Sequence, residues 1–205
     1  MSLEKSCVYI VDDDEAVSGG IKRLVESVGL KAAVFSGGQE FLDAYNRPEP
    51  GCLVLDIRMP DMSGIKLQSK LSENDINIPI IFITGHGDVT TATKALKDGA
   101  FDFFEKPFNE HALLECIREA LAKDLRERDA FALRNEAIGR LQQLSDREKQ
   151  VLNLVMAGKP NKVIAMALEL SQSTIEVHRA NIMKKMKADS LPQLVTLVNM
   201  AREKN

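Results

Sequence analysis

As far as about residue 121, short apolar runs alternate with amphipathic segments. Five runs have the length and composition of buried strands: residues 7–11, 31–35, 52–56, 78–84 and 101–105. The segments between and after them, such as residues 16–29, place apolar residues three or four positions apart, which predicts helices. Five strand–helix pairs in this order predict an α/β domain with a five-stranded, doubly wound parallel sheet. Ligands of such sheets bind at the carboxyl ends of the strands.

After residue 144 the pattern changes, and every segment has helical spacing. Four short helices are expected, at residues 145–158, 161–170, 171–187 and 190–204. Gly158 and Pro160 separate the first two, and Ser171 is placed to cap the third. The pattern therefore predicts a second, all-α domain in the C-terminal part of the chain.

Residues 121–143 join the two patterns. This segment is rich in charged residues and helix formers and contains no Pro. It predicts a helical connector that continues the last helix of the first domain, with a short coiled coil between two copies as the alternative. The predicted division is a first domain at 1–122, a helical linker at 123–143 and a helical domain at 144–205.

The predicted helix at 171–187 has two unlike faces. Ile175, Ile182 and Met186 fall on one side, which is expected to pack on the rest of its domain. The opposite side carries mainly small and polar residues: Ser173, Glu176, Val177, Ala180, Asn181 and Lys184. A helix with such an exposed face can enter the major groove of duplex DNA, which is about 12 Å wide.

Charge is unevenly distributed along the 205 residues, whose net charge is -3. From Arg140 onward there are 11 Lys/Arg and 6 Asp/Glu, a net charge of +5, so the preceding part carries -8. The basic C-terminal part therefore predicts an anionic partner.

The sequence also bears on the compartment. There is no long apolar segment of a signal peptide near the N-terminus, and no apolar run approaches the ~18 residues that span a bilayer. The three cysteines lie among apolar residues at spacings that match no metal motif, so we expect reduced, structural thiols. These features predict a soluble, cytoplasmic protein without a membrane partner.

Acidic residues follow two of the predicted strands. Residues 12–14 are all Asp, and Asp56 ends the third run. Neighbouring carboxylates need a cation, and Mg²⁺ prefers carboxylate oxygens. Thr84 and Lys106 follow the fourth and fifth strands, where a hydroxyl and an ammonium can bind phosphoryl oxygens. The combination predicts that Asp56 is a nucleophile that becomes an aspartyl phosphate.

Four segments, "YIVDDDEAV", "LVLDIRMPDMSG", "IFITGHGDV" and "FFEKPF", resemble the receiver domain of bacterial two-component response regulators. The resemblance covers about residues 5–122 and implies a flavodoxin-like fold. It implies that a sensor histidine kinase phosphorylates Asp56. It also implies that Asp12, Asp13, Asp56 and the backbone carbonyl of Arg58 bind Mg²⁺.

The same resemblance implies roles for residues around the phosphate. Thr84 and Lys106 would sense the phosphoryl group, and Phe103 would be the switch aromatic. Arg58 and His86 occupy positions that tune phosphate lifetime in this family. The turn after Asp56, with Pro60 and Gly64, would shape the loop.

Residues 144–199 resemble the LuxR-type helix-turn-helix, and the whole chain is similar to the FixJ-like regulators, which join these two domains. The resemblance implies a homodimer on phosphorylation, with the last helix as the dimer contact on DNA, and RNA polymerase as a further partner. The predicted contacts to double-stranded promoter DNA are Lys162, Thr174, Glu176, Val177, His178, Ala180, Asn181, Lys184 and Lys185.

The predicted DNA contacts divide by chemistry. Val177 and Ala180 suit a thymine methyl group, and Glu176 can accept from cytosine N4, whereas the lysines are candidates for phosphate contacts. Glu176 has an alternative role in a capping box with Ser173, in the pattern "STIE". Arg179 lies near the buried side and is expected to pair with an acid such as Glu148.

The function expected from these features is transcription regulation, without enzymatic activity beyond self-phosphotransfer and self-dephosphorylation. Three alternatives remain. The first is a phosphorylation-independent DNA-binding regulator. The second is a phosphohydrolase of the haloacid dehalogenase type with "DDDEA" as its D-x-D loop, which leaves the basic helical tail unexplained. In the third, the basic helical tail binds RNA instead of duplex DNA, which the helix-turn-helix pattern disfavours.

Overall fold

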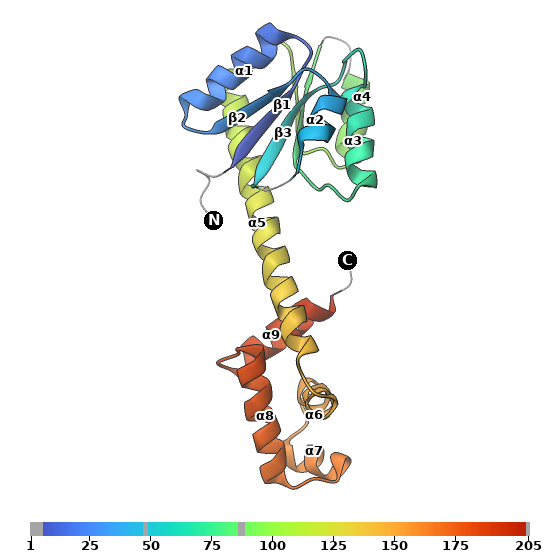
Figure 1. Cartoon of the computed structure of the whole chain (residues 1–205), viewed down its shortest axis with the longest axis vertical. Coiled ribbons are helices and arrows are strands. Elements are labelled where there is room, and N and C mark those ends of the chain that lie inside the picture. The colour runs from blue at the N-terminus through green and yellow to red at the C-terminus, as the bar shows by residue number, and fades with distance from the viewer. Residues whose placement is uncertain (1–5, 47–48, 86–88, 204–205) are drawn as a thin grey trace. The chain divides into compact units, whose positions relative to one another are not determined.

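The computed structural model describes residues 6–46, 49–85 and 89–203, with the side chains of 89–92 excepted. It forms two compact units, Met1–Asp129 and Ala130–Asn205. The boundary falls inside the helix α5, Glu110–Gln142 (Figure 1).

The first unit is an α/β fold with a parallel sheet in the strand order β2-β1-β3-β4-β5. Its strands are β1 Cys7–Val11, β2 Lys31–Phe35, β3 Gly51–Asp56, β4 Ile80–Thr84 and β5 Asp102–Glu105. Its helices are α1 Glu15–Ser27, α2 Gly38–Ala44, α3 Gly64–Glu73, α4 Val89–Lys97 and α5. The predicted sheet and its strand–helix alternation are confirmed. The fourth strand begins later than predicted, after Pro79, which has no backbone N–H for the ladder.

Two hydrophobic cores lie on opposite faces of this sheet. Val8 and Ile10 of β1 pack with α1 and α5, whereas Tyr9 and Val11 pack with α2, α3 and α4. Successive side chains of a strand point to opposite faces, so β1 contributes alternately to both cores. All of β3 is buried, which explains its continuous apolar run up to Asp56.

The three cysteines belong to or adjoin these cores and are all free thiols. Burial, followed by the charge of Asp102, raises the pKa of Cys116 to about 12. Burial also raises the pKa of Cys52 well above its ordinary value. Thiols that resist ionisation are poor nucleophiles, as expected for structural cysteines.

The second unit is helical, with α6 Asp146–Met156, α7 Asn161–Leu168, α8 Gln172–Met186 and α9 Leu191–Arg202. Ser145 and Glu148 form a capping box at the start of α6. Ser171 caps α8 by accepting from the backbone N–H of Thr174, as predicted. Since α8 begins directly after Ser171, the alternative capping box of Ser173 and Glu176 is wrong.

The end of α5 is built into the core of this second unit. Ala137 is fully buried there, and Leu141 packs against the same cluster. The predicted linker at 123–143 is helical and continues the last helix of the first domain, as expected. Side chains of its last turns pack in the core of the helical unit.

The apolar residues of α9 serve mainly that core. Leu194, Leu197 and Val198 are buried, whereas Leu191 is 43% exposed and Val195 is half-buried. In the described part of the chain, no helix is both long enough and apolar enough to span a membrane.

Candidate functional site

A buried ion-pair cluster occupies the carboxyl edge of the sheet in the first unit. The ammonium of Lys106 donates to Asp56 Oδ1 at 2.7 Å and to Asp12 Oδ2 at 2.8 Å. Asp56 ends β3, and Asp12 directly follows the neighbouring strand β1, so sheet order brings the two carboxylates together. Asp56 is only 6% exposed and Asp12 only 3%.

Backbone groups hold the remaining oxygens of the two carboxylates. Asp12 Oδ1 accepts from the N–H of Asp14 at 2.9 Å, and Asp56 Oδ2 accepts from the N–H of Arg58 at 2.5 Å. These bonds orient both side chains toward a shared point at the sheet edge. The side chain of Arg58 itself is exposed.

The other two acids of the triple Asp run have different positions. Asp14 caps α1 by accepting from the backbone N–H groups of Ala16 and Val17. Asp13 is exposed. Within the described residues, no group of three or more His, Cys, Asp or Glu side chains has the arrangement of a metal site. The structure therefore brings together Asp12 and Asp56 of the predicted ligands, with Lys106 between them.

The cluster carries an electrostatic cost. Burial raises the pKa of Asp56, and the nearby charge of Asp12 adds to this, although Lys106 and the Arg58 N–H act against it. Burial alone would lower the pKa of Lys106, but its hydrogen bonds to both carboxylates and their charges outweigh it, so that pKa is raised. Lys106 is therefore held protonated, whereas ionised Asp56 is favoured less than in water.

Thr84 and Phe103, which are predicted to respond to the phosphate, lie on the two strands beyond β3 in the sheet, β4 and β5. Thr84 is buried at the end of β4, and its hydroxyl donates to the carbonyl of Gly85 at 3.2 Å. Phe103, on β5, is half-buried against the core on the α2–α4 side of the sheet. His86 lies outside the described residues.

Gly64 shapes the loop after Asp56. Its N–H donates to the carbonyl of Ile57 at 3.0 Å, which brings the start of α3 against the end of β3. A Cβ atom at position 64 would lie 2.3 Å from the backbone oxygen of Asp56. Only glycine therefore fits this approach without a shift of the backbone.

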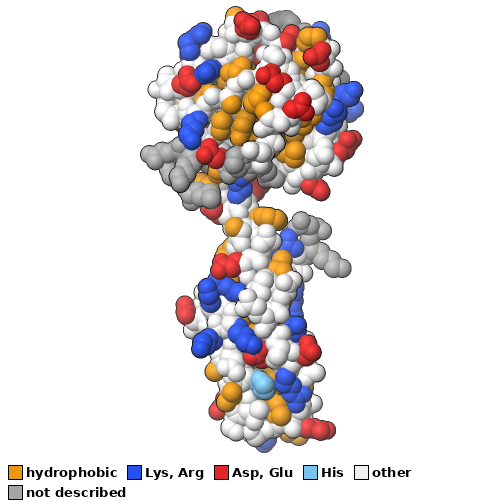
Figure 2. Space-filling model, viewed as in Figure 1, with side chains coloured by type: hydrophobic (Ala, Val, Ile, Leu, Met, Phe, Trp, Pro, Cys, Tyr) orange, Lys and Arg blue, Asp and Glu red, His pale blue; other side chains and the backbone are white. Residues whose placement is uncertain are grey.

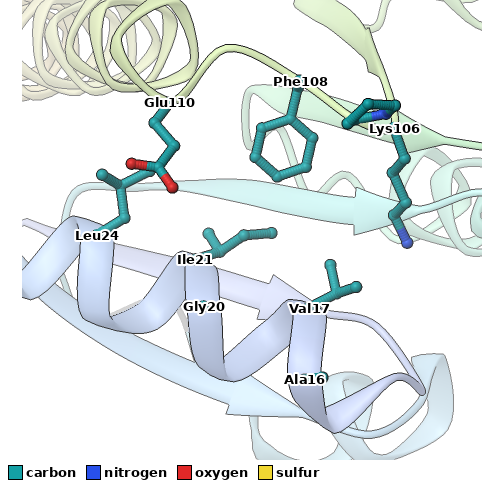
Figure 3. Close-up of a pocket in the computed structure, with 9 residues that line it drawn as sticks. Ala16, Val17, Gly20, Ile21, Leu24, Lys106, Phe108 and Glu110 are labelled. Atoms are coloured by element: carbon teal, nitrogen blue, oxygen red, sulfur yellow. The ribbon is translucent and has the colours of Figure 1, made fainter.

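An apolar groove of about 530 Å³ adjoins the cluster. It lies between α1 and the segment after β5, and Val17, Ile21 and Phe108 extend toward one another across it (Figure 3). Lys106 lines one end, so the groove begins beside the carboxylates. Gly20 also lines it, and a Cβ atom there would meet nothing within 4 Å.

In the second unit, α8 has the two predicted faces. Ile175, Ile182 and Met186 are buried in the core. Val177 is 60% exposed. The other predicted contacts on the outer face are also exposed: Glu176, Ala180, Asn181 and Lys184. Thr174 and His178 are half-buried, and the Thr174 hydroxyl lies 2.7 Å from that of Ser171.

Basic side chains gather on the visible face of the helical unit (Figure 2). Lys162, in the first turn of α7, is exposed. Lys185, a predicted phosphate contact, places its ammonium 2.7 Å from Glu148 Oε2. Arg179 instead donates to the Asn161 side chain at 3.1 Å. The predicted pairing of Arg179 with Glu148 is therefore wrong, because Lys185 occupies that carboxylate.

Comparisons with known proteins identify the family of each unit. Residues 8–118 match the response regulator receiver domain, and residues 142–198 match the bacterial regulatory proteins of the luxR family. The chain belongs to the two-component response regulators. This regulator carries a LuxR-type helix-turn-helix formed by α7 and α8, and its function is transcription regulation.

Relatives of the regulator share both domains. Response regulator protein TmoT of Ectopseudomonas mendocina is 45% identical over 99% of this chain and 92% of its own length. Transcriptional regulatory protein FixJ of Rhizobium meliloti (strain 1021) is 46% identical over 93% of each chain. The solved structure of response regulator StyR is 42% identical, with a TM-score of 0.86 over 95% of this chain and 98% of that one. The FixJ-like resemblance and the fold class are confirmed.

Two arginine contacts in the helical unit were not predicted from the sequence. Arg140 donates to the carbonyl of Met186 at 3.2 Å, and Arg147 donates to the carbonyl of Leu168. Both arginines therefore hold the C-terminal ends of helices in the DNA-binding unit. No motif signals them, since an arginine in a charged segment has the pattern of a solvated residue.

Proposed function

We propose that a sensor histidine kinase phosphorylates the regulator on Asp56, and that the phosphorylated form dimerises and binds promoter DNA. The observation that carries the first step is the Asp56 carboxylate at the carboxyl edge of the sheet, 2.7 Å from the ammonium of Lys106. A carboxylate in this position is a nucleophile for a phosphoryl group. Lys106 and the Thr84 hydroxyl would bind the phosphoryl oxygens.

Magnesium is the metal that suits this pocket. Asp12 and Asp56 offer hard oxygen ligands, and Asp13 and the backbone carbonyl of Arg58 would complete the set. Burial, and after it the charge of Asp12, raises the pKa of Asp56, so a bound cation would stabilise the ionised carboxylate. Bound Mg²⁺ would neutralise charge on the phosphoryl oxygens. The protein's own residues would hold the nucleophile in place through the Arg58 N–H and Lys106.

The haloacid dehalogenase alternative is less well supported by the pocket. Its D-x-D loop would require the Asp14 side chain as the second acid, but that carboxylate caps α1. The relatives are named as regulators rather than enzymes. We therefore propose self-phosphotransfer and self-dephosphorylation as the chemistry of this pocket.

The proposed division of labour follows the sequence. The receiver would comprise residues 1–122, the helical linker 123–143 and the DNA-binding domain 144–205. Phosphorylation would act through Thr84, Lys106 and Phe103, and would promote a homodimer. The dimer would act on promoters with RNA polymerase, in the cytoplasm. A bias of a few kcal/mol between two receiver states would suffice for such a switch.

The kinase is proposed to dock in the apolar groove beside Lys106. A protein that delivers a phosphoryl group to Asp56 must reach this edge of the sheet, and the groove offers apolar surface that begins there. Gly20 leaves the groove open, because its missing side chain would otherwise extend into it.

Replacing Gly20 with leucine should therefore slow phosphotransfer from the kinase by roughly tenfold, the size of a lost interface contact. Labelling by acetyl phosphate should stay unchanged, because the small donor needs no groove. Gly19→Leu is the matched control, since Gly19 lies in the same helix but does not line the groove. The rates are measured against a panel of purified, autophosphorylated histidine kinases. Equal rates for the two variants would refute docking in the groove.

The DNA-binding step rests on the exposed face of α8. A duplex is first selected from a random-sequence library with acetyl phosphate-treated regulator. Val177→Ala should then relax base preference at one position per half-site, by about 1–3 kcal/mol. Lys184→Met should instead weaken binding to all sequences and reduce the salt dependence by about one unit of slope.

Binding of these variants is measured by salt titration on the selected duplex and on calf thymus DNA. The two substitutions test different contacts, since Val177 offers methyl groups and Lys184 a charge. Identical behaviour of the two variants, or preference for RNA of the same sequence over the duplex, would contradict a groove-bound α8.

A further inference from the structure

The C-terminal half of α8 is attached to its neighbours by charged contacts. Lys185 donates to Glu148 Oε2 at 2.7 Å and to the carbonyl of Gln143 at 3.4 Å. Arg140 donates to the carbonyl of Met186, the last residue of α8. Residues from the end of α5, the turn after it and the start of α6 thus hold one end of the helix proposed to read DNA.

The partner of Lys185 is a buried charge. Glu148 is 4% exposed, and its carboxylate also accepts from the backbone N–H of Ser145 at 2.7 Å. Burial would raise the pKa of Glu148, but the hydrogen bonds from Lys185 and Ser145 and the charge of Lys185 outweigh it, and the pKa is lowered. A buried carboxylate that stays ionised requires a cation next to it.

Lys184 and Lys185 are adjacent in sequence but have different surroundings. Adjacent helix positions point about 100° apart. Lys184 shares the exposed face with Val177 and Ala180, which lie seven and four positions before it and therefore on the same side of the helix. Its ammonium forms no ion pair with any side chain in the described ranges. Lys185 points instead to α6.

We propose that Lys185 is a positioning residue: its ammonium fixes α8 on α6 through Glu148, so that the outer face of α8 meets the bases, and it does not serve as a phosphate contact. This inference rests on the proposed DNA-binding function. A lysine that already neutralises a buried carboxylate contributes no net charge for counterion release from DNA. Lys184 then supplies the phosphate contact of this pair.

The test uses the full-length regulator, treated with acetyl phosphate and Mg²⁺, with the selected duplex and calf thymus DNA as probes. Lys185→Met should leave the salt slope of binding unchanged. It should lower the ratio of specific to non-specific affinity by roughly tenfold, about the effect of one lost base contact. Partial unfolding lowers both affinities equally, so it leaves this ratio unchanged. Lys185→Arg should restore the ratio, because the guanidinium keeps the charge beside Glu148.

Glu148→Gln provides a second route to the same pair if Lys185→Met folds poorly. Glu148→Gln should also lower the ratio of specific to non-specific affinity. The double variant, Glu148→Gln with Lys185→Met, should lower this ratio no further than the more affected single variant, because both substitutions remove the same ion pair. Lys184→Met is the matched control, and it should reduce the salt slope by about one unit while the ratio stays constant.

The outcomes separate the two proposals. A loss of one unit of salt slope in Lys185→Met with an unchanged specificity ratio would overturn the positioning role while leaving DNA binding intact. An unchanged ratio in Glu148→Gln would also overturn it. If the wild-type regulator selects no duplex, the DNA-binding function fails, and the positioning role fails with it.

Discussion

Replacing Asp56 with asparagine should abolish phosphorylation of the regulator. Incubation of the wild-type protein with acetyl phosphate and Mg²⁺ should add one phosphoryl group, detected as a mass increase or as acid-stable, base-labile label. Asparagine keeps the size of the side chain and can still accept the Arg58 N–H bond, but its amide is not a nucleophile. The loss should therefore be complete rather than partial.

Asp14→Asn is the matched control for this experiment. It changes another acid near the same sheet edge, but Asn is as good a helix N-cap as Asp, so α1 and the labelling should be preserved. Undiminished labelling of Asp56→Asn would reject Asp56 as the nucleophile and make Asp12 or Asp14 the candidates.

The fold of the Asp56→Asn protein should survive the change. Burial raises the pKa of Asp56 in the folded state. The protonated side chain therefore contributes to folding stability at pH values below its ordinary pKa. This contribution is lost as the pH rises through the folded-state pKa. At neutral pH the ionised carboxylate thus costs stability, which the neutral amide avoids. Lost labelling in this variant therefore reports lost chemistry.

Replacing Gly64 with alanine should destabilise the receiver by about 3 kcal/mol, as for an overpacked core position. The added Cβ would lie 2.3 Å from the backbone oxygen of Asp56 and 3.0 Å from side-chain carbons of Leu55 and Phe82. Two of these neighbours belong to the buried strand β3, so they cannot move without disturbing the sheet. The strand that carries the nucleophile would shift with them.

Urea unfolding followed by tyrosine fluorescence measures this effect in the receiver alone. The chain has no Trp and only two Tyr, Tyr9 and Tyr45, which pack on each other in the first unit with ring centroids 5.1 Å apart. Gly20→Ala is the control, since its Cβ meets no atom and the helix should gain up to about 1 kcal/mol. An unfolding midpoint of Gly64→Ala equal to that of the wild type would show that the loop yields without cost.

The sheet could be predicted because each strand and helix has a recognisable pattern in its own stretch of sequence. Parallel strands buried on both faces read as continuous apolar runs, and the order of strands and helices leaves few topologies. The carboxyl ends of parallel strands lie at the same edge of the sheet. Asp12, Asp56 and Lys106, which end or follow these strands, are therefore expected at that edge. The role of Phe103 could not be predicted from its own sequence pattern. A half-buried aromatic on the last strand has no local feature that distinguishes a switch residue from a core residue.

Contacts between distant segments could not be predicted in this way. Lys185 and Glu148 are 37 residues apart, and a lysine in a basic run has the pattern of a solvated helix end. The pairing depends on how α8 crosses α6, which the sequence pattern does not specify. Ala137 was missed for a similar reason, since one buried alanine in a charged helix produces no apolar stripe.

The groove beside Lys106 also depends on tertiary structure. It is formed where α1 passes the segment after β5, and the two are separated by most of the first unit in sequence. Glycine inside a helix costs up to about 1 kcal/mol relative to alanine, and no sequence pattern explains one at position 20. Its position on the groove wall gives that glycine a physical role.

Phosphorylation of Asp56 should control binding of α8 to DNA. The most direct test is fluorescence anisotropy of the selected duplex with full-length wild-type regulator and Asp56→Asn, each before and after acetyl phosphate and Mg²⁺, at one fixed salt concentration. Acetyl phosphate should tighten DNA binding by the wild-type protein and leave DNA binding by Asp56→Asn unchanged. Equal tightening in both proteins, or wild-type binding that is the same with and without acetyl phosphate, would contradict it.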